Sequence, residues 1–323
     1  MGATWIAKPV KSLSAGDLSD WQSQDWGPNL APSQTPAWGR AGLILGVEPI
    51  LVFSPDRRIS ALFFRNGSEA ECVNGPVYDW TKIASPAEQN ELIGMTVHAL
   101  LQCRPEITRV TLRPRMAESD LEQFLGRSAF PSDGLDRSAT LTLNLDTPSE
   151  QTLFQSLGPR IRHEVSRAER AGVITEIVDT GLSIDLFWQR CATLYSARQL
   201  WLPPVEWIRA LIHTPERGTF IIRSTHPSTG SLGELLVFST GSRAFNLFAA
   251  ETRAPHCPNL SLNAPAQWAA IKILRNLGIK TYDLNGISHP DAESAPGFEG
   301  VNTYKRKFKG REMRFAHPLL RFG

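Results

Sequence analysis

Both halves of this chain follow the same order of segments: short apolar strands, amphipathic helices, further strands and a last helix. In the first half a helix is expected over Pro86–Cys103, because Ser85 is a suitable N-cap and Glu88 follows at capping-box spacing. Apolar runs between Pro-Asp and Asn-Gly turn signals predict strands around it. The other elements expected here are strands over Gly42–Val47, Ile50–Phe53, Ile59–Phe64, Arg109–Leu112 and Ala139–Leu145, and a short helix over Glu118–Leu125.

The second half repeats this order, with a hairpin turn at Thr240-Gly241-Ser242 and a helix that Gly278 ends just before a strand. The expected helices are Thr152–Ala171, Ile184–Leu200, Pro204–His213 and Leu262–Leu277, and the expected strands are Thr219–Arg223, Gly233–Thr240, Ala244–Ala250 and Lys280–Leu284. The pattern predicts the α+β class, with two similar domains in tandem. Because Pro148 and its neighbours make a plausible junction, we expect domains at 1–147 and 148–323, with the C-terminal tail packing back on the first.

The composition is that of a soluble globular protein. Of the 323 residues, 41% are hydrophobic and 20% are charged, and no stretch approaches the roughly 18–20 apolar residues that a membrane span needs. The first residues lack the apolar segment of a secretory signal. We therefore expect a cytoplasmic, monomeric protein with no membrane span and no cofactor.

Cysteine and tryptophan, two residue types that often mark binding sites, have structural interpretations here. No cysteine belongs to a Cys-x-x-Cys pair, and the adjacent His256 and Cys257 lack a second pair of metal ligands. We expect no metal, and reduced thiols at Cys72, Cys103, Cys191 and Cys257. The nine tryptophans are interpreted as core residues rather than as stacking platforms.

Charge is distributed unevenly along the chain. Residues 1–150 carry 13 Lys and Arg against 18 Asp and Glu, a balance of −5, whereas residues 151–323 carry 21 against 14, a balance of +7. Residues 299–323 alone hold seven Lys and Arg and two Glu. This basic half is either a solvated surface or a site for an anionic ligand such as a phosphate, a nucleotide or RNA.

The turn that ends the strand Lys280–Leu284 is a candidate site. Asn285-Gly286 leaves backbone N–H groups unpaired beside a row of cations, an arrangement that holds a phosphate or a polarised carbonyl. Asp283, just before this turn, has two interpretations: its carboxylate caps the turn, or it acts as a general base.

Two basic segments have both a structural and a functional interpretation. Tyr304–Arg311 is expected to be a short strand whose lysines share one face, either a charged edge that prevents aggregation or part of an anion site. Apolar residues recur at helical spacing from Ile161 to Ala168. This helix is either a salt-bridged surface helix or an anion site formed by Arg160, Arg162 and His163.

Six short motifs follow one another over nearly the whole chain. They are Pro32-Ser33-Gln34 with Trp38, Asn74–Asp79, the Arg160–Val173 helix, Ala197-Arg198 with Trp201, Tyr282–Ile287, and Gly300–Gly310 with Tyr304, Lys305 and Phe308. Together they resemble the motifs of the Fem family of aminoacyl-tRNA-dependent transferases, within the wider GNAT superfamily. The resemblance implies two tandem GNAT-like domains, here without the coiled-coil arm of some members.

The resemblance also implies a reaction, the formation of an amide. An aminoacyl group would leave the 3′ end of a tRNA and join an amine on a peptide, a cell-wall precursor or a small metabolite. By position, Lys305 corresponds to the cation that stabilises the developing oxyanion, and Arg198 to an arginine that contacts substrate phosphates. The other implied substrate-binding residues are Arg40, Arg113, Asp283, Gly286 and Tyr304, and those implied to position the tRNA end are Lys307, Lys309 and Arg311.

The chain departs from the family on the acceptor side, since Arg113 stands where peptidoglycan-directed members carry an Asp.

Two other functions remain open. An N-acyltransferase with a thioester donor would need a glycine-rich pyrophosphate loop, and the nearest segment, Leu157-Gly158-Pro159-Arg160, contains a proline without an N–H. A non-catalytic binding protein on the same fold is the third possibility.

Overall fold

The computed structural model of the chain describes residues 5–22, 26, 30–79, 82–119, 135–178, 181–198, 200–213, 218–255, 260–290 and 298–323. It divides into two compact units, one formed by Met1–Ser138 with Arg314–Gly323 and the other by Ala139–Met313. Each unit has a hydrophobic core of its own. Trp80, His256, Cys257 and most of the helix expected over Glu118–Leu125 lie outside the described residues.

The first unit is built on a mixed sheet with the strand order β1-β2-β3-β4-β6-β15, in which β5 also pairs with β3. β4 and β6 pair in parallel, and the other neighbours are antiparallel. The strands are β1 (Ile6–Pro9), β2 (Glu48–Phe53), β3 (Ile59–Asn66), β4 (Glu69–Val73), β5 (Val77–Tyr78), β6 (Arg109–Arg113) and β15 (Leu320–Phe322). A short strand, β7 (Met116–Ala117), pairs with the end of β14 (Arg311–Pro318).

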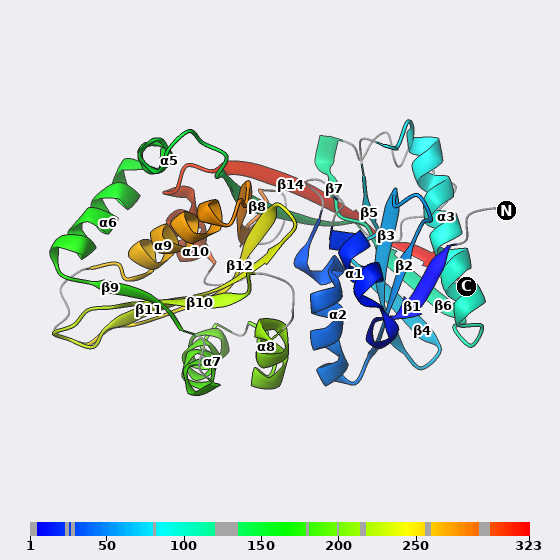
Figure 1. The fold of residues 1–323 in the computed structure, drawn as a ribbon, viewed down its shortest axis with the longest axis horizontal. Coiled ribbons are helices and arrows are strands. Elements are labelled where there is room, and N and C mark those ends of the chain that lie inside the picture. The colour runs from blue at the N-terminus through cyan, green and yellow to red at the C-terminus, as the bar shows by residue number, and fades with distance from the viewer. Residues whose placement is uncertain are drawn as a thin grey trace. The chain divides into compact units, whose positions relative to one another are not determined.

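Helices cover both faces of this sheet. α1 (Ala15–Gln22) and α2 (Pro36–Gly42) lie on one face, and α3 (Pro86–Cys103) lies on the other (Figure 1). Alternate residues of β2 face the two sides: Ile50 and Val52 belong to the cluster that packs with α3, and Leu51 and Phe53 belong to the cluster beneath α1. The period of two along a strand therefore gives this sheet a core on each face.

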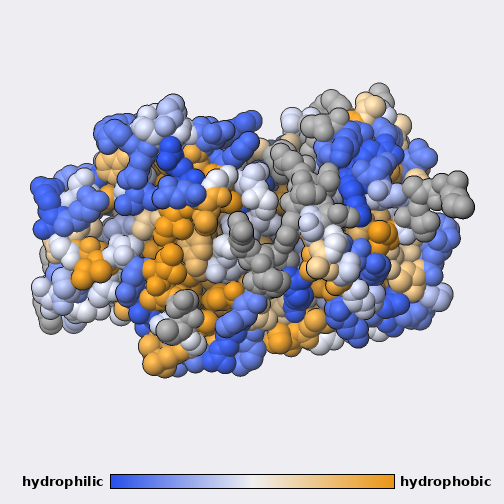
Figure 2. Space-filling view, in the orientation of Figure 1, coloured by the Kyte–Doolittle hydropathy of each residue, from blue (hydrophilic) through white to orange (hydrophobic). Residues whose placement is uncertain are grey.

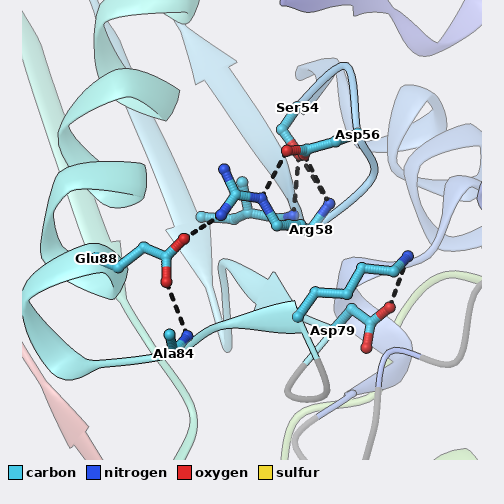
Figure 3. A network of polar contacts seen from close by, with 8 residues as sticks. Ser54, Asp56, Arg58, Asp79, Ala84 and Glu88 are labelled. Carbon is cyan, nitrogen blue, oxygen red and sulfur yellow. Dashed lines mark hydrogen bonds and ion pairs between the residues drawn. The ribbon is translucent and has the colours of Figure 1, made fainter.

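A polar network joins the β2–β3 turn to the beginning of α3 (Figure 3). The Arg58 guanidinium bonds to Asp56 at 2.6 Å and also pairs with Glu88. Glu88 in turn accepts a hydrogen bond from the N–H of Ala84 at 2.7 Å, and the Ser54 hydroxyl bonds to Asp56 at 2.7 Å. These contacts hold the first turn of α3 against the sheet and give its N-terminus the acidic partner that the helix dipole favours.

The second unit contains the strand order β14-β8-β13-β12-β11-β10-β9. Its strands are β8 (Leu135–Asn144), β9 (Ile174–Val178), β10 (Phe220–Thr225), β11 (Leu232–Thr240), β12 (Arg243–Thr252) and β13 (Thr281–Ile287). Its helices are α5 (Glu150–Ser156), α6 (Pro159–Arg170), α7 (Gly181–Ser196), α8 (Val205–Ile212), α9 (Asn263–Asn276) and α10 (Glu299–Arg306). α6, α9 and α10 lie on one face of the sheet and α7 and α8 on the other (Figure 1).

Most of the expected elements are confirmed, with ends that shift by a few residues. Ser85 caps α3 as expected, since its hydroxyl accepts a hydrogen bond from the N–H of Glu88 at 3.2 Å. The remaining confirmed elements are β2, β3, β6, β8, β10, β11, β12, β13, α7, α8 and α9. The sequence did not predict the short strands β1, β4, β5, β7, β9 and β15 or the strand β14.

Two of the expected elements, one strand and one long helix, are wrong. Gly42–Val47 is not a strand, because the capping hydroxyl of Thr35 begins α2, and a 3₁₀ turn over Leu43–Leu45 continues it. The helix expected over Thr152–Ala171 is interrupted after Ser156. Pro159 begins a new helix there, since it lacks the N–H that a continuous helix would need.

The basic strand expected over Tyr304–Arg311 is also wrong. α10 extends to Arg306, and β14 begins only at Arg311. The apolar residues Val301, Tyr304 and Phe308 recur at helical spacing, and only the lysines between them suggested strand alternation. The lysines therefore do not share one face, and each has a different environment.

No helix in the described part of the chain is long and apolar enough to cross a membrane. The described cysteines, Cys72, Cys103 and Cys191, are free thiols. Burial raises the pKa of Cys72 and of Cys191 above that of an ordinary thiol, so neither is a reactive thiolate.

Candidate active site

A pocket opens in the second unit where two parallel strands separate. β12 and β13 are paired only from Arg243–Thr281 to Phe245–Asp283, and beyond this point neither strand continues the ladder to the other. The pocket has a volume of about 1070 Å³ and is lined by the residues that follow on each strand, Asn246–Ala249 and Leu284–Gly286. The split leaves side chains of both strands open to a ligand. The expectation that the N–H groups of Asn285-Gly286 are unpaired is wrong, because that of Asn285 donates to Asp283 at 2.7 Å and that of Gly286 to the side-chain oxygen of Asn285 at 2.8 Å.

Lys305 reaches into this split from α10. Its ammonium donates hydrogen bonds to the carbonyl oxygens of Asn285 at 3.1 Å and Gly286 at 2.7 Å. An ammonium has three N–H donors, so one remains for a ligand as far as the described residues go. Burial lowers the pKa of Lys305 from the ordinary 10.5 to about 8, against the attraction of Asp283, which raises it. Lys305 is therefore a cation held in a fixed place, and its pKa lies only moderately above that of an exposed histidine, about 6.5.

The turn beside Lys305 is shaped by Asp283. This buried carboxylate accepts a hydrogen bond from the N–H of Asn285 at 2.7 Å and another from the hydroxyl of Thr140. Asn285 has a left-handed backbone, with φ of 65°, and the pairing of β13 with β8 is irregular between Asp283 and Gly286. The irregular turn directs two consecutive carbonyl oxygens at Lys305, and Asp283 has the contacts of a cap rather than those of a base.

Tyr304 precedes Lys305 on α10 and also lines the pocket. Tyr304 packs edge-on against Phe308, with ring centroids 5.5 Å apart, and the ammonium of Lys307 lies 5.6 Å from its ring. Burial raises the pKa of Tyr304 well above its ordinary value, and the nearby Glu164 and Glu251 raise it further. Tyr304 is therefore a neutral phenol at the pocket wall.

The two sides of the pocket differ in chemistry. On the α6 side, Arg160, His163 and Arg167 line it, and Lys307 is 3.4 Å from Glu164. The side formed by the end of α7 and by β12 is largely apolar and aromatic, with lining residues Leu194, Tyr195, Leu200, Trp201, Leu247 and Phe248, and it also carries Arg198. Figure 2 shows both kinds of surface on this unit, an apolar region bordered by hydrophilic side chains. Such a pocket suits a ligand with an anionic part and a flat or apolar part.

The structure brings together five of the residues implied by the sequence. Lining the pocket are Lys305, Arg198, Gly286, Tyr304 and Lys307, and Asp283 is buried behind the turn. Lys309 and Arg311 do not line it; Lys309 is exposed, and the carbonyl of Arg311 accepts a hydrogen bond from Thr142 at 3.3 Å.

The remaining two implied residues belong to the first unit. Arg40 lies in the last turn of α2, and the Nε of Arg113, in β6, lies 3.5 Å from Glu71. Their roles at a substrate stay predictions.

Some pocket residues escaped the sequence analysis. Asn246 is only 8% exposed, and its side-chain oxygen has no hydrogen-bond partner among the described residues. One signal for it existed, a single polar residue within the otherwise apolar run Ala244–Ala250. Glu251 and Arg253, which pair at 2.5 Å, gave no such signal. No cluster of three or more His, Cys, Asp or Glu side chains that could hold a metal occurs among the described residues.

No family model matches the chain, and no curated protein matches its sequence. Solved structures do match. A crystal structure of FemX aligns over 98% of this chain and 97% of its own, with a TM-score of 0.74 and 13% identity. L-PGS from Bacillus licheniformis aligns over 97% of this chain and 93% of its own, with a TM-score of 0.58 and 11% identity. The C-terminal domain of a putative lysylphosphatidylglycerol synthetase from Agrobacterium fabrum aligns over 94% and 92%, with a TM-score of 0.58 and 14% identity.

These likenesses establish the fold. The chain has the fold of FemX over nearly its whole length. The Fem-like fold that the six motifs implied is confirmed at this level, as is the α+β class with two units in tandem. The activity is a separate question, which depends on the pocket.

Proposed function

We propose that this protein is an acyltransferase that moves an aminoacyl group from the 3′-terminal ester of a tRNA to an amine and forms an amide. The observation that carries the proposal is the position of Lys305, a fixed and partly buried cation at the split between β12 and β13. The likeness of fold to FemX supports the same reaction class.

The geometry suits the charge that develops in this reaction. The acceptor nitrogen forms a bond to the ester carbonyl carbon and loses a proton, while the ribose oxygen leaves and gains one. The carbonyl oxygen is negative in between. The remaining N–H of Lys305 meets that oxygen, while Asn285 and Gly286 hold the ammonium in place. One preorganised donor of this kind contributes about 10²–10³ in rate.

The charge of the pocket supports an RNA donor. Arg160, Arg167 and Arg198 are exposed at its lining and suit the phosphates next to the terminal ester, whose neutralisation makes binding depend on salt. The acceptor is an amine on a peptide, a cell-wall precursor or a small molecule in the cytoplasm. For Arg40 and Arg113 we propose contacts with that acceptor, and for Lys309 and Arg311 contacts with the RNA outside the pocket.

A thioester donor has weaker support. The N-terminus of α9 lines the pocket, as a pyrophosphate site would require, but two of its first three residues offer no free N–H. The N–H of Ala264 bonds to the hydroxyl of Ser261 at 3.3 Å, and Pro265 has no N–H. Gly158, in the other candidate loop, packs against the carbonyl of Lys307, where an added Cβ would lie 2.0 Å from its oxygen. Neither segment is an open phosphate cradle.

The test is an aminoacyl-transfer assay. A pool of tRNA charged with labelled amino acids is incubated with a panel of amines, and label in amide products is counted for the wild type, Lys305→Ala and Lys280→Ala. We expect transfer by the wild type and by Lys280→Ala, an exposed lysine outside the pocket, and a loss of about 10²–10³ for Lys305→Ala. Equal transfer by all three proteins would refute the role of Lys305. Label transfer from a thioester but not from tRNA would refute the donor.

A further inference from the structure

Trp201 is an exception among the tryptophans. It is 65% exposed and lines the pocket, whereas every other tryptophan in the described part of the chain is buried or half-buried. An exposed indole gains little stability for the fold, since most of its apolar surface remains in water. Its place at the pocket, rather than elsewhere on the surface, needs a functional explanation.

The loop that carries Trp201 is anchored on both sides. The N–H of Leu200 donates to the carbonyl of Tyr195 at 2.9 Å, and the N–H of Arg198 donates to the same oxygen at 3.1 Å. Beyond Trp201, the carbonyl of Pro203 accepts a hydrogen bond from the indole of Trp188 at 2.8 Å. The backbone on both sides of Trp201 is therefore held next to the pocket before any ligand binds, which reduces the entropy lost on binding.

The surroundings of Trp201 combine aromatic surface with positive charge. Tyr195 and Phe248 form an edge-to-face pair with centroids 5.9 Å apart, and Arg198 is three residues away from Trp201 on the same anchored loop. Across the pocket lie the arginines of α6, and the acidic residues of the lining, Glu164 and Glu251, are each paired with a cation. An aromatic surface next to arginines is the usual arrangement for a nucleotide.

We infer that Trp201 stacks on a nucleobase of the substrate, while Arg198 contacts the adjoining phosphate. The assignment of that base to the 3′ end of an RNA rests on the proposed function. The same chemistry, a base joined to a phosphate, is also present in a coenzyme A thioester and in a nucleotide-linked acceptor. Loss of the stacking of one base should weaken binding by about 5- to 150-fold.

The experiment compares ligands that differ in one base. An RNA hairpin ending in unpaired CCA and the same hairpin with an abasic last nucleotide are titrated into the wild type, Trp201→Leu, Trp201→Phe and Leu182→Ala. Leu182 is a matched control, since it is 70% exposed on α7 and does not line the pocket. We expect the wild type and Leu182→Ala to bind the intact hairpin about ten-fold more tightly than the abasic one. Trp201→Phe should keep part of that preference, and Trp201→Leu none of it.

Two further pairs of probes separate the sources of the base: coenzyme A against phosphopantetheine, and uridine diphosphate against pyrophosphate. If the wild type binds its probes without a preference for the base in any of the three pairs, or if Trp201→Leu keeps the preference, the stacking inference is overturned and the transferase proposal stands. A Trp201-dependent preference only for coenzyme A or uridine diphosphate supports the stacking site and refutes the RNA end as its occupant. Binding of none of the three probes by the wild type overturns the inference.

Discussion

The ammonium of Lys305 donates hydrogen bonds to two consecutive carbonyl oxygens, those of Asn285 at 3.1 Å and Gly286 at 2.7 Å. The donor is on α10 and the acceptors are on β13, so one side chain joins the helix to the strand at the point where the sheet splits. Because the acceptors are neutral carbonyls, they orient the cation without cancelling its charge. A substrate oxygen can therefore meet a full positive charge in a fixed place.

The lowered pKa of Lys305 predicts an alkaline limit to activity. Since the folded-state pKa is about 8, the ammonium is charged at neutral pH and loses its proton as the pH rises through 8. Lys305→Arg stays charged over this range, so we expect the ratio of wild-type to Lys305→Arg single-turnover rates to fall by about ten-fold for each pH unit above 8. A ratio that is constant from about pH 6.5 to 9.5 would contradict the role of the charge.

The same shift predicts a change in stability with pH. Lys305 has a lower pKa in the folded protein than the ordinary 10.5, so the unfolded chain binds more protons between pH 8 and 10.5. The contribution of Lys305 to the free energy of unfolding must therefore increase as the pH rises from 8 to 10.5. Urea unfolding of the wild type and Lys305→Met at about pH 7.5 and 10 measures this. Methionine carries no charge to bury, so we expect the free energy of unfolding of Lys305→Met, relative to that of the wild type, to be lower at about pH 10 than at about pH 7.5.

Asn285 tests whether the turn positions Lys305. Its side chain is exposed, but its backbone has φ of 65°, which costs an ordinary residue about 1–2 kcal/mol. We expect Asn285→Ala to slow transfer by about 10- to 100-fold, because strain relief displaces a carbonyl that holds the ammonium. Asn285→Gly, which accepts this φ, should remain within a few-fold of the wild type. Single-turnover rates check both, and equal rates would show that the turn geometry is irrelevant.

Gly158 tests the close packing of α6 against the end of α10. A Cβ at Gly158 would lie 2.0 Å from the carbonyl oxygen of Lys307, although its backbone suits any residue. We expect Gly158→Ala to lower the free energy of unfolding by about 1–3 kcal/mol. Gly94→Ala is the control: its Cβ would meet no atom within 4 Å in the middle of α3, so it should raise that free energy by about 0.5–1 kcal/mol. Denaturant titration measures both, and equal effects would contradict the contact.

Gln34, part of the first Fem-like motif, is predicted to stabilise the fold rather than bind substrate. It is completely buried; its amide donates to the carbonyls of Leu62 at 3.2 Å and Val73 at 2.7 Å and accepts from the N–H of Leu62 at 2.9 Å. Gln34→Leu leaves these groups unpaired, at about 1–3 kcal/mol for each. We expect a fall in unfolding free energy of at least about 2 kcal/mol, measured in urea. A variant as stable as the wild type would refute this role.

Much of the candidate site could be predicted from the sequence, though not its form. The order of motifs pointed to Lys305, Tyr304, Arg198 and Gly286, and all four line one pocket. The strand expected over Tyr304–Arg311 was wrong because a segment of this length fits both a period of two and a period of 3.6. Packing on the sheet favours the helix. In α10 the side-chain oxygen of Asn302 accepts a hydrogen bond from the N–H of Ser288, just beyond β13, at 2.9 Å.

The sequence by itself determined what depends on neighbouring residues. Caps such as Ser85 and Thr35, the break at Pro159 and the stop at Gly278 act over one helical turn, so the helices begin and end near where local chemistry requires. The excess of basic residues in the second half follows from composition alone.

Only the tertiary structure decided the environment of each side chain at the site. The pKa of Lys305, the exposure of Trp201 and the unpaired oxygen of Asn246 depend on strands and helices far apart in the chain. Whether β12 and β13 stay paired or separate is likewise a balance of packing over the whole sheet. Solvation and hydrogen bonding depend on distance in space, and for that reason no local pattern reveals them.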